Sequence, residues 1–153
     1  MSRIADRLAE LGLTLPTVAA PVAAYVPAVV QGNFVYTSGQ LPFVDGSLPA
    51  TGKVGGSVSA EAAQGYAATC ALNALAAIDS VIGSLDRVTQ VVKVTGFVAS
   101  DPSFTGQPGV LNGASNLLGE LFGDAGIHAR SAVGVAVLPL DSPVEVELVV
   151  AFA

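Results

Sequence analysis

The chain has very few of the residues that disulfide and zinc chemistry require. Its 153 residues include one cysteine, one histidine and no tryptophan. A single cysteine excludes an internal disulfide, and one cysteine with one histidine cannot assemble a zinc site of nitrogen and sulfur ligands. We therefore expect no metal site, and we expect Cys70 to be a buried, inert thiol.

Basic residues are also scarce, and this scarcity argues against one class of partner. Lysine and arginine together number 6 against 12 aspartates and glutamates, which gives a net charge of −6. Such a protein gains little from the counterion release that drives binding to RNA or DNA. Nucleic acid is therefore not an expected partner, and a ribonuclease activity fits this composition poorly.

Charge of either sign is low. Charged residues make up 12% of the chain and hydrophobic residues 52%, whereas roughly 25% charge is typical of globular domains. A monomer of this composition would leave much apolar surface in water, so we expect an oligomer.

No long apolar run is present either. The first ten residues carry Arg3, Asp6, Arg7 and Glu10, where a secretory signal would need an uninterrupted apolar segment. Residues 11–44 are uncharged, but proline, glycine and polar residues interrupt every stretch that approaches the ~20 apolar residues of a membrane span. We expect a soluble, cytoplasmic protein with no membrane segment.

Apolar spacing and turn residues predict a single α+β domain over residues 1–153. Helices are expected at 2–12, 59–83 and 112–122. Strands are expected at 25–30, 34–37, 88–99, 131–138 and 144–152. This order gives a mixed sheet with two helices on one face and the short N-terminal helix as an addition. We expect copies of the same chain to cover the other face.

Two charged residues interrupt predicted strands near the end of the chain. Arg130 stands in His-Ala-Arg-Ser-Ala-Val, and Glu145 stands in Pro-Val-Glu-Val-Glu-Leu. A charge in a buried strand needs a partner or a ligand that offsets the loss of water. A fixed guanidinium near a fixed carboxylate can hold a small carboxylic acid and a water, so the pair predicts an active site. The ordinary alternatives are a solvated arginine and a glutamate on the solvent side of an edge strand.

Several short motifs occur in a characteristic order. They are Gln-Gly-Asn-Phe-Val-Tyr-Thr-Ser-Gly-Gln-Leu-Pro at 31–42, Val-Val-Lys-Val at 91–94, Ala-Arg-Ser at 129–131, Leu-Pro at 138–139 and Val-Glu-Val-Glu at 144–147. Together, over roughly residues 20–152, they resemble the Rid family of reactive intermediate deaminases, also called YjgF-type or endoribonuclease L-PSP.

The resemblance implies a chorismate-mutase-like fold and a homotrimer with three active sites in the clefts between subunits. In deaminating members the matching arginine, here Arg130, binds the substrate carboxylate, and the matching glutamate, here Glu145, orients the attacking water. The matching tyrosine and turn, here Tyr25, Ser38 and Gly39, line the cleft. We expect Arg130 and Glu145 of one subunit to share a cleft with residues such as Tyr25 of a neighbour.

The chain departs from the family pattern at predicted substrate-binding positions. Ala132 stands where well-studied deaminases have a cysteine, although the backbone carbonyl of this residue is the group expected to meet the substrate. Asn112 begins a helix motif that usually reads Asn-x-x-Tyr, and Ser115 takes the place of the tyrosine. We expect His128 to be structural or to line the rim of the cleft, because no Ser-His-Asp or Cys-His arrangement follows from the sequence.

The activity implied by the resemblance is hydrolysis of reactive 2-imino or 2-enamino acids to 2-keto acids and ammonia. Such hydrolysis needs a cation for the carboxylate, a positioned water and a group that manages protons, and it needs no cofactor. The alternative is a trimeric protein that binds small carboxylates, or regulates through them, without turnover.

Overall fold

A five-stranded mixed sheet forms the centre of the structure, a computed structural model that describes residues 2–18 and 23–153. Its strands are β1 (Ala28–Gln31), β2 (Phe34–Thr37), β3 (Val88–Ala99), β4 (Ala129–Val135) and β5 (Val144–Phe152). They lie in the order β1-β2-β5-β3-β4. The pair β3 and β4 is parallel, and the other neighbouring pairs are antiparallel. The strand β4 is therefore an edge of the sheet.

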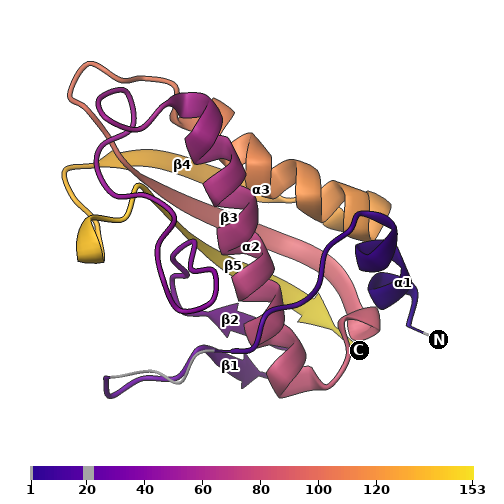
Figure 1. Cartoon of the computed structure of the whole chain (residues 1–153). Coiled ribbons are helices and arrows are strands. Elements are labelled where there is room, and N and C mark those ends of the chain that lie inside the picture. Colours follow the sequence, from indigo (N-terminus) through magenta and orange to yellow (C-terminus); the bar gives the residue numbers. More distant parts are fainter. Residues whose placement is uncertain (1, 19–22) are drawn as a thin grey trace.

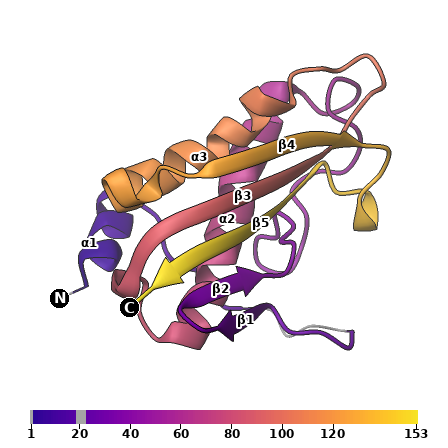
Figure 2. The same cartoon turned by 180° about the vertical axis from the view of Figure 1, so that it is seen from behind.

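Helices cover one face of this sheet (Figure 1). α2 (Ala60–Ile82) and α3 (Gln107–Phe122) lie across it, and α1 (Arg3–Glu10) packs beside α3. Figure 2 shows the opposite face, which no helix of the described residues covers. We call this the bare face. The predicted α+β arrangement of a mixed sheet and covering helices is confirmed.

Strand residues alternate between the two faces. In β5, Val144, Val146, Leu148 and Val150 are buried beneath the helices, whereas the intervening Glu145 and Glu147 point to the bare face. The helix α2 is long and apolar enough to cross a membrane, but half of its most apolar stretch is buried, in contact with the sheet and α3. It is the core helix of this fold.

The elements marked by capping or turn residues have the predicted bounds. α2 begins after Ser59, whose side chain accepts the N–H of Ala62, and it ends at Gly83. β3 and β5 span the residues predicted for them. The sequence also predicts an extended connector over residues 16–24, and these residues lie partly outside the described ones.

Three elements have bounds that differ clearly from the predicted ones. α3 begins at Gln107 rather than residue 112, because Pro108 fits the first turn of a helix, where its missing N–H is not needed. β1 begins at Ala28 rather than residue 25, since Pro27 has no N–H for the ladder. β4 spans 129–135 rather than 131–138, because its partner β3 ends at Ala99.

α1 docks through both its end and its side. The Asp86 carboxylate accepts the N–H groups of Arg3 (3.0 Å) and Ile4 (2.8 Å) at the start of the helix. The bond from Ile4 above all lowers the pKa of Asp86. Arg7 Nε donates to the carbonyl of Glu120 near the end of α3 (3.0 Å). The predicted N-terminal helix is thus confirmed, and these contacts fix it to the core.

Candidate active site

Arg130 lies on the edge strand β4, and its side chain contacts the first half of α3. Nη1 donates to Asn112 Oδ1 (2.9 Å) and to Ser115 Oγ (3.1 Å), and Nη2 donates to the carbonyl of Pro108 (3.3 Å). All three acceptors are neutral. In the described part of the chain Arg130 forms no ion pair. The guanidinium is therefore held in place without being neutralised.

The bonds to α3 leave part of the guanidinium free for a ligand. A guanidinium carries five N–H donors, of which Arg130 uses both on Nη1 and one on Nη2. Among the described residues no acceptor binds the remaining two, on Nε and Nη2. These nitrogens are adjacent, and adjacent N–H groups bind a carboxylate through both of its oxygens.

Two glycines allow α3 to lie close enough for this contact. Gly113 of α3 lies against the backbone carbonyl of Gln64 in α2, and Gly96 of β3 lies against Leu111 of α3. A Cβ atom at either glycine would collide with its neighbour. The close packing holds Asn112 beside the edge of the sheet.

Two residues that were not predicted as substrate-binding extend the cluster. Ser115 Oγ lies 2.8 Å from His128 Nε2, and His128 Nδ1 lies 2.6 Å from the carbonyl of Gly126. Signals for both were present in the sequence. Asn112 and Ser115 are three apart and so share a helix face, while His128 and Arg130 are two apart along extended chain. The expectation of a structural role for His128 agrees with its contacts.

Glu145 occupies a different environment, on the bare face of β5. Its partial burial raises the pKa of its carboxyl, and the nearby charge of Glu147 raises it further. Gly39 lies against this carboxylate, and a Cβ atom at Gly39 would collide with Glu145 Oε1. The preceding Ser38 donates its hydroxyl to the carbonyl of Val26 (2.6 Å). The predicted Ser-Gly turn thus lies against the carboxylate of Glu145.

The remaining predicted residues lie apart from one another. Tyr25 precedes β1, next to the Val26 carbonyl that Ser38 binds, and 56% of its surface is exposed. Ala132 lies on β4 opposite Gly96 of β3, where it packs against the helix-side core. Tyr25 is therefore on the Glu145 side of the molecule and Ala132 on the Arg130 strand.

The register of the sheet places Arg130 and Glu145 on opposite faces. Arg130 pairs with Val94 of β3, which pairs with Leu148 of β5, and both apolar residues are buried beneath the helices. Glu145 pairs with Phe97, an odd number of residues along β3 from Val94, so its side chain points the other way. The expectation that both groups of one subunit share a cleft is therefore wrong.

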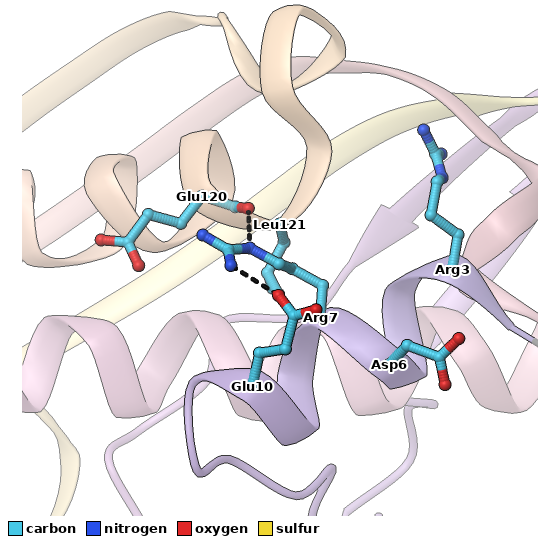
Figure 3. A pocket seen from close by; sticks show the side chains of 6 residues that line it. All are labelled: Arg3, Asp6, Arg7, Glu10, Glu120 and Leu121. Carbon is cyan, nitrogen blue, oxygen red and sulfur yellow. Dashed lines mark hydrogen bonds and ion pairs between the residues drawn. The ribbon is translucent and has the colours of Figure 1, made fainter.

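A surface hollow of about 450 Å³ lies elsewhere, between α1 and α3 (Figure 3). Its lining residues are Arg3, Asp6, Arg7, Glu10, Glu120 and Leu121. Arg7 points toward α3, and its charge is neutralised by Glu10 at 2.7 Å. None of the predicted site residues lines this hollow. Within residues 2–18 and 23–153, no cluster of three or more His, Cys, Asp or Glu side chains is arranged to hold a metal ion.

Comparison with known proteins decides the family. The model of the YjgF/chorismate mutase-like family matches residues 5–153. The chain belongs to this family. The predicted resemblance to Rid proteins is thereby confirmed. One relative is the 2-iminobutanoate/2-iminopropanoate deaminase of Escherichia coli strain K12. It is 35% identical over 89% of this chain and 94% of that protein.

Two other relatives resemble the chain more strongly. Protein TCP17 of Trypanosoma cruzi is 46% identical over 97% of this chain and 93% of that protein. The crystal structure of Atu1372 from Agrobacterium tumefaciens, a protein of unknown function, has a TM-score of 0.93 and 45% identity, and the match covers 99% of this chain and 93% of that chain. The YjgF-like fold therefore extends over nearly the whole chain, including α1.

Proposed function

We propose that this protein hydrolyses small 2-imino or 2-enamino acids to 2-keto acids and ammonia. The observation that carries the proposal is the guanidinium of Arg130, which neutral groups of α3 hold while two adjacent N–H donors stay available. This arrangement suits a small carboxylate. The relatives named 2-iminobutanoate/2-iminopropanoate deaminase support the choice of reaction.

Glu145 is the proposed proton carrier. Burial raises its pKa, and a carboxylate with a raised pKa accepts a proton from water more readily than an ordinary glutamate does. It accepts a proton from water while the water oxygen adds to the imine carbon. It then gives this proton to the nitrogen, which completes the carbinolamine. Glu145 next takes up the hydroxyl proton and passes it to the same nitrogen as the C–N bond breaks, so that the hydroxyl becomes the carbonyl of the 2-keto acid and ammonia leaves. The reaction consumes only water, so it needs no cofactor.

We propose that the site is completed between copies in a homotrimer. Arg130 lies at the sheet edge, where it can approach the bare face of a neighbouring copy. The bare face exposes apolar side chains, with exposed fractions of 50% for Tyr36 and 44% for Val133, which supports burial against another subunit. Each site would combine Arg130, Asn112 and the Ala132 carbonyl of one copy with Glu145, Ser38, Gly39 and Tyr25 of the next.

Mixing two inactive variants tests this arrangement. Arg130→Ala and Glu145→Gln, each inactive alone, are co-expressed with different tags and purified as mixed oligomers. A site shared between subunits regains about a quarter of the wild-type sites in a random trimer, because each site needs one intact residue from each of two neighbours. A site built within one chain would regain no activity, and light scattering that gives a monomeric mass at micromolar concentration would also contradict the proposal.

The second candidate is carboxylate binding without turnover. It is favoured by one observation, that the Arg130 cluster is complete within a single chain while Glu145 lies on the opposite face. Trapping of imine with semicarbazide, beside 2-keto acid affinity by calorimetry, separates the two. Binding of keto acids with no imine cleared faster than in buffer, over a panel of side chains, would select the binding protein.

A further inference from the structure

We propose that Ser115 and His128 are positioning residues that orient the guanidinium of Arg130 for a planar carboxylate. The inference rests on the proposed carboxylate-binding role of Arg130. Its basis is a continuous chain of contacts: Arg130 Nη1 to Ser115 Oγ at 3.1 Å, Ser115 Oγ to His128 Nε2 at 2.8 Å, and His128 Nδ1 to the carbonyl of Gly126 at 2.6 Å.

The direction of each hydrogen bond follows from the chemistry of the two ends. A backbone carbonyl only accepts, so His128 Nδ1 carries the proton and donates to Gly126. In a neutral imidazole Nε2 is then the acceptor, and Ser115 must donate its hydroxyl hydrogen to it. The guanidinium only donates, so Ser115 Oγ accepts from Arg130. We call the chain of contacts from Arg130 through Ser115 and His128 to Gly126 the relay. When His128 is neutral, only one arrangement of its hydrogens satisfies all three contacts.

The relay is anchored at a rigid point. Gly126 is buried, and a Cβ atom there would collide with the carbonyl of Leu118, so this residue lies directly on the backbone of α3. With its single hydrogen committed to His128, Ser115 turns its lone pairs toward Arg130. Without His128 the hydroxyl can rotate, and its hydrogen can then point toward Arg130 in place of its lone pairs. The relay thus fixes the guanidinium plane with neutral groups and leaves its charge available.

Binding of 2-oxobutanoate, measured by calorimetry, tests the role without requiring turnover. Ser115→Ala should weaken binding about fivefold, since one neutral hydrogen bond to the guanidinium is lost, while Ser115→Thr keeps the hydroxyl and restores affinity to within about twofold. Asn116→Ala, at the exposed neighbouring position of α3, is the matched control and should leave affinity unchanged. Unchanged affinity in Ser115→Ala would overturn the relay.

Two readouts separate positioning from a general loss of structure. The affinity ratio between 2-oxobutanoate and the neutral 2-oxobutanamide should fall in Ser115→Ala, because only the carboxylate needs both adjacent N–H groups of the Arg130 guanidinium in one orientation. His128→Ala should weaken binding in the wild-type background but have no further effect in Ser115→Ala, since His128 acts through Ser115. An unchanged ratio or additive effects would contradict the proposal.

A measurement without ligand completes the test. Nitrogen NMR of labelled histidine in the assembled protein should show that the neutral imidazole of His128 carries its proton at Nδ1 and not at Nε2. The opposite tautomer would overturn the relay whatever the activity of the protein. If wild type binds 2-oxobutanoate but clears no imine, the deaminase proposal fails while the relay is still judged by binding and by the tautomer.

Discussion

Two arginines contact α3 from outside the helix, one near each end, and they are held in different ways. Near the C-terminal end, Arg7 donates to the carbonyl of Glu120 and pairs with the Glu10 carboxylate at 2.7 Å. In the N-terminal half, Arg130 donates only to neutral acceptors, among them Asn112. An arginine that attaches a helix has its charge neutralised by its own chain. An arginine available to a ligand is fixed but keeps its charge.

The largest expected effect comes from removing one arginine or the other. Arg130→Ala should lower kcat/KM for imine hydrolysis by on the order of 10²-fold or more, because the carboxylate clamp is lost. Arg130→Lys should recover little of it, since an ammonium cannot reproduce the bidentate fork. Arg7→Ala is the matched control and should leave kcat/KM within about twofold. Semicarbazide trapping measures all three variants. Equal losses for Arg7→Ala and Arg130→Ala would contradict the assignment of Arg130 alone to ligand binding.

The next effect concerns Glu145, the partly buried carboxylate on the other face. Glu145→Gln keeps the shape but cannot accept a proton, so kcat should fall by about 10²-fold while keto-acid affinity stays within about twofold. In wild type, kcat should fall as the pH drops through the raised pKa of Glu145, at a higher pH than an ordinary glutamate would give. A kcat that is independent of pH in this range would argue against Glu145 as the base.

The raised pKa of Glu145 also predicts a gain in stability when the charge is removed. A carboxyl whose pKa is higher in the folded state stabilises the fold below its unfolded pKa, and this contribution is lost as the pH rises through the folded pKa. Glu145→Gln should therefore raise the melting temperature at pH 7, and the gain should shrink toward pH 3. A melting temperature lowered at pH 7 would contradict this sign.

A smaller effect is expected from a substitution that gives Arg130 a carboxylate partner, as Arg7 has. In the wild-type protein Asn112 Oδ1 accepts from Arg130 Nη1 at 2.9 Å. Asn112→Asp places a carboxylate oxygen at this position. The charge is then neutralised within the chain, and 2-oxobutanoate affinity should fall about tenfold because the new carboxylate competes with the ligand. Calorimetry measures the loss, and Asn116→Asp controls for the added negative charge. Equal affinities in the two variants would show that ligand binding by Arg130 does not depend on its acceptors being neutral.

The smallest effect is expected at the exposed ion pair of Arg7. Glu10→Gln removes the carboxylate but leaves the bond from Arg7 to Glu120. Exposed ion pairs contribute about 0–1 kcal/mol, so the melting temperature should drop by a few degrees at most and kcat/KM should not change. Differential scanning calorimetry in low and high salt checks this, since salt should reduce the difference.

The sequence was sufficient for the regular elements and for the identity of the charged pair. Clear periodicity located β3 and β5, and the cap at Ser59 located α2. Arg130 and Glu145 stood out because charges are costly in strand sequence. Where a proline was compatible with two structures, as at Pro108 in the first turn of α3, local pattern alone gave the wrong start.

The relation between the two groups could not be predicted, because it depends on strand register. Whether Arg130 and Glu145 share a face is decided by their partners Val94 and Phe97 on β3, and an odd separation reverses the direction of the side chain. A motif that aligns with a family does not show whether the separation of these partners along β3 is odd or even. The contact of Ser115 with the strand likewise required the tertiary packing of α3.

The docking of α1 sets an order of events during synthesis. Its partners lie far along the chain, since Arg3 is 83 positions from Asp86 and Arg7 is 113 positions from Glu120. At about 5–20 residues per second a ribosome needs on the order of ten seconds to pass from Arg7 to Glu120, and an isolated helix of this length is marginal in water. Because α1 is synthesised before both of its partners, it can complete its docking only after α3 has been made.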